Sequence, residues 1–127
     1  MSNLFRARHV RTNKLDVRSF NQVLFIDPNK QTVKAEGMIT FEHLVDETLK
    51  HGFLPAIVPE LKTITLGGAV AGIGIESSSF KYGLVHEAVT ELDILTGNGD
   101  IVTANANNEH RDLFLGFPNS YGTLGYT

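Results

Sequence analysis

The sequence predicts an α+β domain in which a mixed or antiparallel sheet is flanked by helices. Two pairs of strand-like segments are each joined by strong turn chemistry, and one amphipathic helical segment lies between the pairs. Strands and helices do not alternate regularly along the chain, which argues against a parallel α/β fold. The 127 residues, 42% hydrophobic and 20% charged, suffice for one domain with a buried core.

The first strand pair covers residues 23–36. Its strands are Val23–Ile26 and Thr32–Glu36, joined by the turn Asp27–Lys30. Proline fixes φ in this turn, and aspartate and asparagine tolerate tight backbone conformations. The mixed apolar and polar segment Leu15–Phe20 is a candidate short strand ahead of the hairpin.

A helix is predicted after Gly37, which ends the hairpin pattern. Thr40 is its expected N-cap, because a threonine hydroxyl accepts a free backbone N–H. The apolar residues that recur at helical spacing are Phe41, Leu44, Val45 and Leu49. Gly52 ends the helix, with Lys50 and His51 in the last turn, and an extended link containing Pro55 and Pro59 follows.

The second strand pair consists of Val89–Leu95 and Ile101–Ala104. The turn Thr96–Asp100 contains Asn98-Gly99, a pair that accepts positive φ. Asp112–Leu115 is expected to form one helical turn, and Leu124–Thr127 the start of another strand.

Composition excludes several functional classes. A net charge of −3 gives no electrostatic footprint for nucleic acid. The absence of cysteine removes disulfides, thiolate metal sites and a cysteine nucleophile, and fits a cytoplasmic location. The longest apolar stretch, Leu66–Ile75, is shorter than the roughly 20 residues that span a bilayer, so no membrane partner is expected.

The most informative segment is Thr63–Ser79, in which Gly67, Gly68, Gly72 and Gly74 fall within eight residues. Glycine allows positive φ and close approach, so consecutive amides here can form a concavity that binds an anion. Serine and threonine hydroxyls in the segment would add donors. The alternative is a tight packing corner between a strand and a helix.

Two common phosphate-binding motifs do not fit this segment. A dinucleotide fingerprint requires a third glycine where Ser77 stands. A P-loop requires lysine and then serine or threonine after Gly72, where Ile73 and Gly74 stand.

The order of several motifs is more specific than the number of glycines. The motifs are Pro59–Gly68, Gly72–Ser79, Lys81–Gly83, Thr96–Asp100, Asp112–Phe114 and Gly122–Thr127. In this order they closely resemble the PCMH-type FAD-binding domain of the FAD-linked oxidases, the vanillyl-alcohol oxidase family. The segment Gly-Ile-Glu-Ser-Ser-Ser at 74–79 is most similar to the Δ24-sterol reductase (seladin) branch. The resemblance covers most of the chain from about Leu15.

The resemblance implies an FAD-dependent oxidoreductase that moves hydride between a substrate carbon and flavin, either by reducing a C=C bond or by oxidising an alcohol. It implies that Tyr126 lies where main-chain groups of the family hold the adenine. The residues implied to line the flavin and diphosphate through backbone donors are Thr65, Leu66, Gly67, Gly68, Gly72, Ile73, Gly74, Ile75, Glu76, Ser77 and Ser78.

Two features of the family are not found in the sequence. An earlier glycine-rich loop, often carrying a histidine for covalent flavin attachment, has no counterpart before Leu15, and no substrate-binding domain follows. We therefore expect an N-terminal segment, 1–14, and a partial FAD-binding domain, 15–127, corresponding to the larger subdomain. A small-molecule substrate would bind the missing domain, and such a fragment is expected to be inactive alone and able to self-associate.

No catalytic residue is assigned from the sequence. His43, Glu47 and His51 share one predicted helix face, but a solvated face explains them better than a metal site. Histidine side chains in general exchange protons near neutrality, and His86 lies close to the glycine segment, so proton transfer is conceivable there, although a capping or surface role is favoured. The competing functional hypothesis is a non-catalytic module that keeps the fold and binds another nucleotide or a partner.

Overall fold

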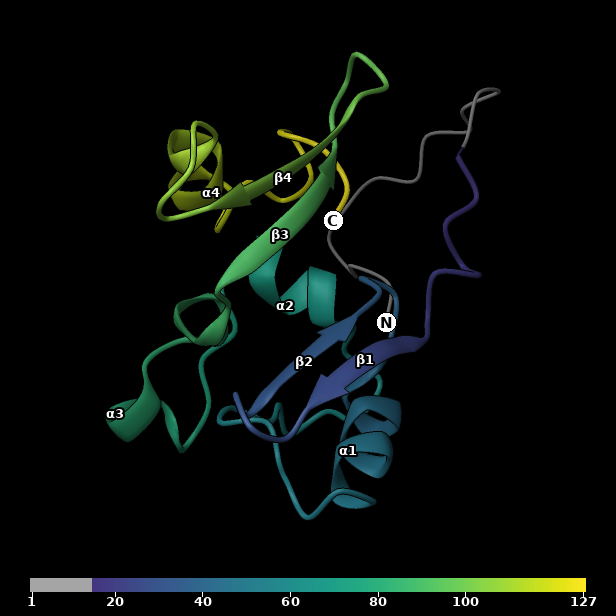
Figure 1. Ribbon diagram of the computed structural model, residues 1–127, viewed down its shortest axis with the longest axis vertical. Helices are drawn as coiled ribbons and strands as arrows, with labels where there is room; N and C mark the ends of the chain where they lie inside the picture. Colours follow the sequence, from purple (N-terminus) through teal and green to yellow (C-terminus); the bar gives the residue numbers. More distant parts are fainter. Residues whose placement is uncertain (1–14) are drawn as a thin grey trace.

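The computed structural model describes residues 15–127 and confirms the α+β class (Figure 1). The elements, in chain order, are β1 (Val23–Asp27), β2 (Thr32–Ala35), α1 (Phe41–Leu49), α2 (Leu66–Ala71), α3 (Ser79–Tyr82), the 3-10 helix η1 (Val85–Ala88), β3 (Glu91–Leu95), β4 (Ile101–Asn105) and α4 (Arg111–Gly116). Among these residues the strands form two separate two-stranded antiparallel sheets, β1–β2 and β3–β4.

The predicted first hairpin is confirmed. Val23 pairs with Ala35 and Asp27 pairs with Thr32. The Asp27 carboxylate accepts hydrogen bonds from the backbone amides of Asn29 and Lys30, at 3.0 and 3.1 Å, and so fixes the turn.

The prediction of a short strand at Leu15–Phe20 is wrong. This segment turns back on itself, because the Phe20 amide donates to the Val17 carbonyl at 3.1 Å. The Asp16 carboxylate holds the Arg18 amide at 3.1 Å and also pairs with its guanidinium. Local contacts therefore satisfy groups that a strand would have paired with a neighbour.

Helix α1 begins where the sequence predicts. The Thr40 hydroxyl accepts the His43 amide at 3.3 Å as the N-cap. Phe41 and Leu44 are each 2% exposed and form its inner face. The helix ends at Leu49, slightly earlier than expected, so that Lys50 is the C-cap and His51 lies in the following turn.

The second hairpin is also confirmed. Leu95 pairs with Ile101, and the Thr96 amide donates to the Asp100 carbonyl at 2.9 Å across the turn. Gly99 takes a φ of +90°. The expected final strand is reduced to one bridge, in which Tyr126 pairs with Leu95.

The core joins the two hairpins through α2, which lies between them in Figure 1. Val70 of α2 and Ile94 of β3 are 2% and 0% exposed, and Phe117, after α4, is 1% exposed. The other buried core residues come from α1, α2, η1, β3, β4 and the links between elements. Within the described part of the chain, no helix is both long and apolar enough to cross a membrane.

Candidate functional site

The glycine segment starts as a helix, not as an open loop. Residues Leu66–Ala71 form α2, and the Thr65 hydroxyl caps it by accepting the Gly68 amide at 3.2 Å. Ala69 and Val70 turn inward and are buried in the core. The hydroxyl expected to serve a ligand therefore already accepts a hydrogen bond from the helix.

Replacing Thr65 by alanine should lower the stability of the protein by about 1 kcal/mol, because loss of an N-cap leaves a helix amide without its partner. Urea unfolding of the full-length protein measures this change. Thr65→Ser keeps the oxygen and should retain most of the stability; equal losses in the two variants would contradict the capping role.

The four glycine amides are consumed within the protein. The Gly67 amide donates to the Gly37 carbonyl at 2.8 Å, and the Gly68 amide to the cap. The amides of Gly72 and Gly74 donate to helix carbonyls, those of Gly68 and Ala69, at 2.9 and 2.8 Å. Contacts within the protein therefore use all four glycine amides, and binding of the diphosphate by these amides stays a prediction.

Two of the glycines serve packing, as the alternative interpretation held. A Cβ on Gly67 would lie 3.0 Å from the Gly37 carbonyl oxygen, and one on Gly74 would lie 2.8 Å from the Val85 side chain. At both positions two segments approach each other closely, and only glycine, which has no side chain, leaves enough room.

Gly68 and Gly72 differ, because they are spaced one helical turn apart and leave backbone uncovered. Apart from its chain neighbours and the backbone of its own helix, the only described heavy atom within 4 Å of a Cβ on Gly68 would be the Thr65 hydroxyl, at 2.8 Å. A Cβ on Gly72 would meet the Gly68 carbonyl oxygen at 2.9 Å and the Tyr121 ring at 3.8 Å. We call the surface of Gly68 and Gly72 the bare strip of α2.

A different set of amides is free in the second half of the segment. The amides of Ile73, Ile75, Ser77 and Ser78 make no hydrogen bond to any residue in the range 15–127. The amides of Gly74 and Glu76, which lie between them, are paired. We call these four unpaired amides the open donors; they are the groups that remain able to bind an anion.

The backbone at the start of the open donors is strained. Ile73 has a φ of +55°, a conformation that β-branched residues rarely adopt. It follows the C-cap Gly72 and allows the Gly74 amide to reach back to the Ala69 carbonyl, as in a Schellman turn. The turn thus directs the chain away from α2 into the segment that carries the open donors.

Hydroxyl groups hold this segment in place. The Ser78 hydroxyl donates to the Ala56 carbonyl at 3.0 Å, and the Ser79 hydroxyl accepts the Glu76 amide at 3.0 Å. Beyond them, the Lys81 ammonium lies 4.9 Å from the centroid of the Tyr82 ring. These hydroxyls anchor the C-terminal end of the segment, and the hydrogen bonds of Gly74 with Ala69 and Val85 anchor its start.

The main chain of Tyr126 is paired with β3. Its amide donates to the Leu95 carbonyl at 2.9 Å, and its carbonyl accepts the Leu95 amide at 2.7 Å. Both groups thus have a partner within the protein, and the placement of adenine at Tyr126 stays a prediction. The Tyr126 hydroxyl is buried without a partner among the described residues, and burial, followed by the charge of Glu36, raises its pKa above the usual value.

The candidate histidines within residues 15–127 are His43, His51 and His86. His43 lies 3.5 Å from Glu47 on α1, while His51 lies beyond that helix, so the expected shared face is shortened. His86 lies in η1, where its Nδ1 is buried without a partner among residues 15–127. The expected surface or capping role of His86 does not explain this buried and unpaired nitrogen.

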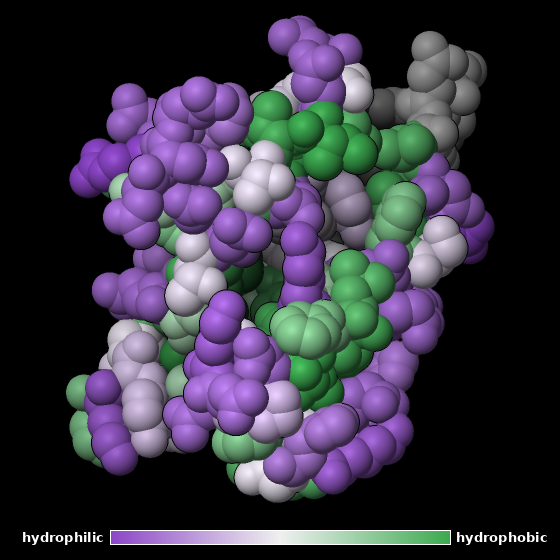
Figure 2. Space-filling model, in the orientation of Figure 1, coloured by the Kyte–Doolittle hydropathy of each residue, from purple (hydrophilic) through white to green (hydrophobic). Residues whose placement is uncertain are grey.

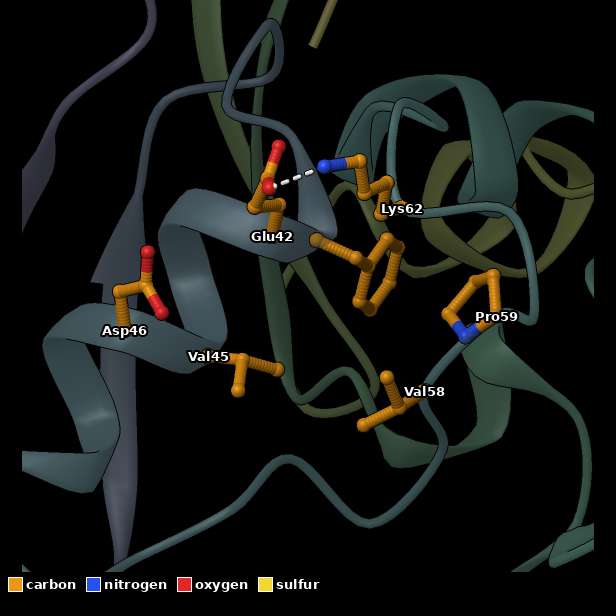
Figure 3. A pocket seen from close by; sticks show the side chains of 7 residues that line it. Glu42, Val45, Asp46, Val58, Pro59 and Lys62 are labelled. Atoms are coloured by element: carbon orange, nitrogen blue, oxygen red, sulfur yellow. Dashed lines mark hydrogen bonds and ion pairs between the residues drawn. The ribbon is translucent and has the colours of Figure 1, made fainter.

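A separate apolar groove of about 210 Å³ lies between α1 and the link that follows it (Figure 3). Phe41, Val45 and Val58 form part of its wall, and a Lys62–Glu42 ion pair of 2.6 Å crosses its rim. No residue of the glycine segment lines this groove, so it is distinct from the candidate site.

The geometry described above agrees with the comparisons with known proteins. Residues 2–105 match the model of a family described as an FAD binding domain, and the chain belongs to this family. It is 37% identical over 120 residues to the Delta(24)-sterol reductase of Pisum sativum and 34% identical over 120 residues to that of Homo sapiens. These matches cover 94% of this chain but only 21% and 23% of the two reductases, so the chain spans about a fifth of their length.

A solved structure has the same fold. The 6-hydroxy-D-nicotine oxidase of Arthrobacter nicotinovorans superposes with a TM-score of 0.78 at 22% identity, over 87% of this chain and 24% of that one. The predicted PCMH-type FAD-binding fold is thereby confirmed, and FAD is confirmed as the cofactor of the family.

The residues present fit a dinucleotide. Its diphosphate is an anion, and the open donors supply four amides within six residues without any requirement for a nearby arginine. The bare strip would let a bulky planar group lie directly on the backbone. The candidate residues predicted from the sequence include all four open donors, with most weight on the glycine amides, and they do not include Tyr121.

Proposed function

We propose that this chain is the FAD-binding part of a flavin-dependent oxidoreductase that transfers hydride between a substrate carbon and the cofactor. The observation that carries the proposal is the set of open donors beside the bare strip, in a chain of the FAD-binding family. FAD supplies the hydride chemistry in such enzymes, and the protein binds, orients and shields it.

The chain's own contribution is cofactor binding. The amides of Ile73, Ile75, Ser77 and Ser78 would hold diphosphate oxygens, and hydrogen bonds of this kind to a charged group are among the strongest in proteins. The Ser78–Ala56 hydrogen bond fixes the segment beforehand, so that little ordering remains on binding. The other predicted lining residues, Thr65 to Gly68, would contribute surface, not donors.

The relatives favour reduction of a C=C bond over oxidation of an alcohol as the direction of the reaction. Both sterol reductases align over nearly the whole chain at 34–37% identity, whereas the oxidase is similar at 22%. We propose that a small-molecule substrate binds in a part of the protein outside this chain, since the chain spans only about a fifth of those reductases.

Exposed apolar surface supports contacts with further protein. Leu24 and Phe25 of β1 are 57% and 59% exposed, and green, apolar atoms gather over the β1–β2 hairpin in Figure 2. We propose that this surface is covered by other parts of a longer chain, or by a second copy when the chain is alone. The proposed cytoplasmic location is supported by the cysteine-free composition.

The test is the visible spectrum of the full-length protein after gel filtration. We expect a bound flavin chromophore, or one gained on adding FAD, that is bleached anaerobically by a reduced donor and restored by a substrate with an activated C=C bond. A protein that neither carries nor takes up FAD would refute the proposal and favour the non-catalytic module. Bound flavin that no donor or acceptor changes would favour a binding function without catalysis.

A further inference from the structure

Tyr121 combines a half-exposed ring with a backbone conformation that tyrosine rarely adopts. Its φ is +50°, and the side chain is 54% exposed. Its amide donates to the carbonyl of Ala71, the last residue of α2, at 3.1 Å. Residues with positive φ other than glycine cluster at ligand sites, because surrounding contacts must hold them there.

Two strained residues meet at the same corner of the fold. Ile73, with a φ of +55°, lies two residues after Ala71, to which Tyr121 is bonded. Strain in both segments therefore converges where α2 ends and the open donors begin. Glycine at either position would adopt the same φ without strain, so the backbone conformation does not explain why isoleucine and tyrosine occur there.

The ring of Tyr121 borders the bare strip. Its Cε1 lies 3.8 Å from the position that a Cβ on Gly72 would occupy, an ordinary van der Waals separation. Gly68, one turn earlier, is exposed and carries no side chain. The aromatic ring thus borders the uncovered backbone in space, at Gly72, and the first open donor, Ile73, follows Gly72 directly in the chain.

We propose that Tyr121 is a binding residue whose ring packs against a planar heteroaromatic ring of the bound dinucleotide, beside the bare strip of Gly68 and Gly72. The proposal rests on the proposed FAD-binding function. Stacking between an aromatic side chain and a base stabilises binding without hydrogen bonds. The missing side chains of the two glycines leave room for a flat group to lie next to the ring.

The strained backbone provides a test that separates binding from structure. Tyr121→Gly removes the ring and the strain together, and the main-chain bond to Ala71 is retained. The melting temperature of the apoprotein should hold or rise, while the affinity for FAD should fall by about 10-fold or more, as expected for loss of one stacked ring. A merely structural tyrosine would not give these opposite changes.

Two further variants serve as controls. Tyr121→Phe keeps the ring and should retain wild-type affinity. Asn119→Gly relieves a similar φ, +63°, at an exposed residue that does not border Gly72, and should leave FAD affinity unchanged. The full-length apoprotein is titrated with FAD, and FMN and ADP are measured in competition with it.

The outcomes identify the ring or overturn the proposal. If Tyr121→Gly weakens FAD and FMN but not ADP, the partner of Tyr121 is the isoalloxazine, and its fluorescence should also be less quenched in the variant. Weakened FAD and ADP with unchanged FMN identifies adenine. If the wild type binds FAD and Tyr121→Gly binds all three ligands as tightly as the wild type does, the proposal for Tyr121 alone is overturned. Absence of FAD binding by the wild type removes the proposed function itself.

Discussion

Ser77→Pro should weaken FAD binding by about 10- to 100-fold and leave the fold intact. The Ser77 amide is one of the open donors, and proline has no N–H to offer. A hydrogen bond to a charged group contributes roughly 1.5–3 kcal/mol, and each 1.4 kcal/mol corresponds to about a tenfold change in affinity.

The backbone at this position suits proline. The Ser79 amide donates to the Glu76 carbonyl at 2.9 Å, which closes a four-residue turn, and Ser78 has a φ of −81° and a ψ of −6°. These angles match the third position of a type I turn, so Ser77 occupies the second, where proline is favoured. Stability should therefore stay level or rise by about 0.4–1 kcal/mol.

The measurement is a fluorescence titration of the full-length apoprotein with FAD, alongside thermal unfolding without FAD. Ser77→Ala is the matched control, because it removes the hydroxyl and keeps the amide. Wild-type affinity in Ser77→Pro would exclude this amide from the site. Equal losses in both variants would instead assign the contact to the hydroxyl.

Gly125→Ala should destabilise the protein by about 2–6 kcal/mol, because a strained backbone and an overpacked core each contribute about 1–3 kcal/mol. Gly125 has a φ of +141°, and a Cβ there would lie 2.4 Å from the Leu95 carbonyl oxygen and 2.9 Å from the Ile94 side chain. The chain has little room to move away, since Ile94 is fully buried and both the amide and the carbonyl of Leu95 are hydrogen-bonded to Tyr126.

Urea unfolding of the full-length protein measures this loss, which is a large share of the roughly 5–15 kcal/mol that stabilises a typical domain. Two other glycines separate its causes. Gly122→Ala meets no described atom within 4 Å but has a φ of +81°, so it reports backbone strain alone. Gly97→Ala has neither clash nor positive φ. A loss in Gly125→Ala no larger than in Gly122→Ala would show that the close contact with β3 is relieved by a small shift.

Sequence predicted the parts of the fold that short-range chemistry determines. Asp27 fixes the first turn, Thr40 caps α1, and Gly99 takes the positive φ of the second turn. Helix α2 was missed because glycine disfavours helices by about 1 kcal/mol per residue, so Gly67 and Gly68 indicated a loop. The cap at Thr65 and the burial of Ala69 and Val70 outweigh that preference.

The sequence indicates a candidate segment but not which of its amides are left unpaired. Residue types indicate that amides in 65–78 are accessible, but only the hydrogen bonds show which ones are left over. Tyr121 could not be predicted, because its φ and its position beside Gly72 depend on a contact with Ala71, fifty positions earlier in the sequence. Ser120 and Thr96 likewise have buried hydroxyls without described partners, which no sequence pattern indicates.

The two hairpins share no strand pairing, and the six-residue helix α2 lies between them. Cooperative opening units in proteins commonly coincide with such supersecondary motifs. The candidate site is thus located at the junction of two such units, which one core cluster and the Lys34–Asp93 ion pair also join, and not inside either one. A ligand seated there would tie the opening of one unit to that of the other, so that cofactor occupancy would govern how the domain resists proteolysis and slow amide exchange as a whole.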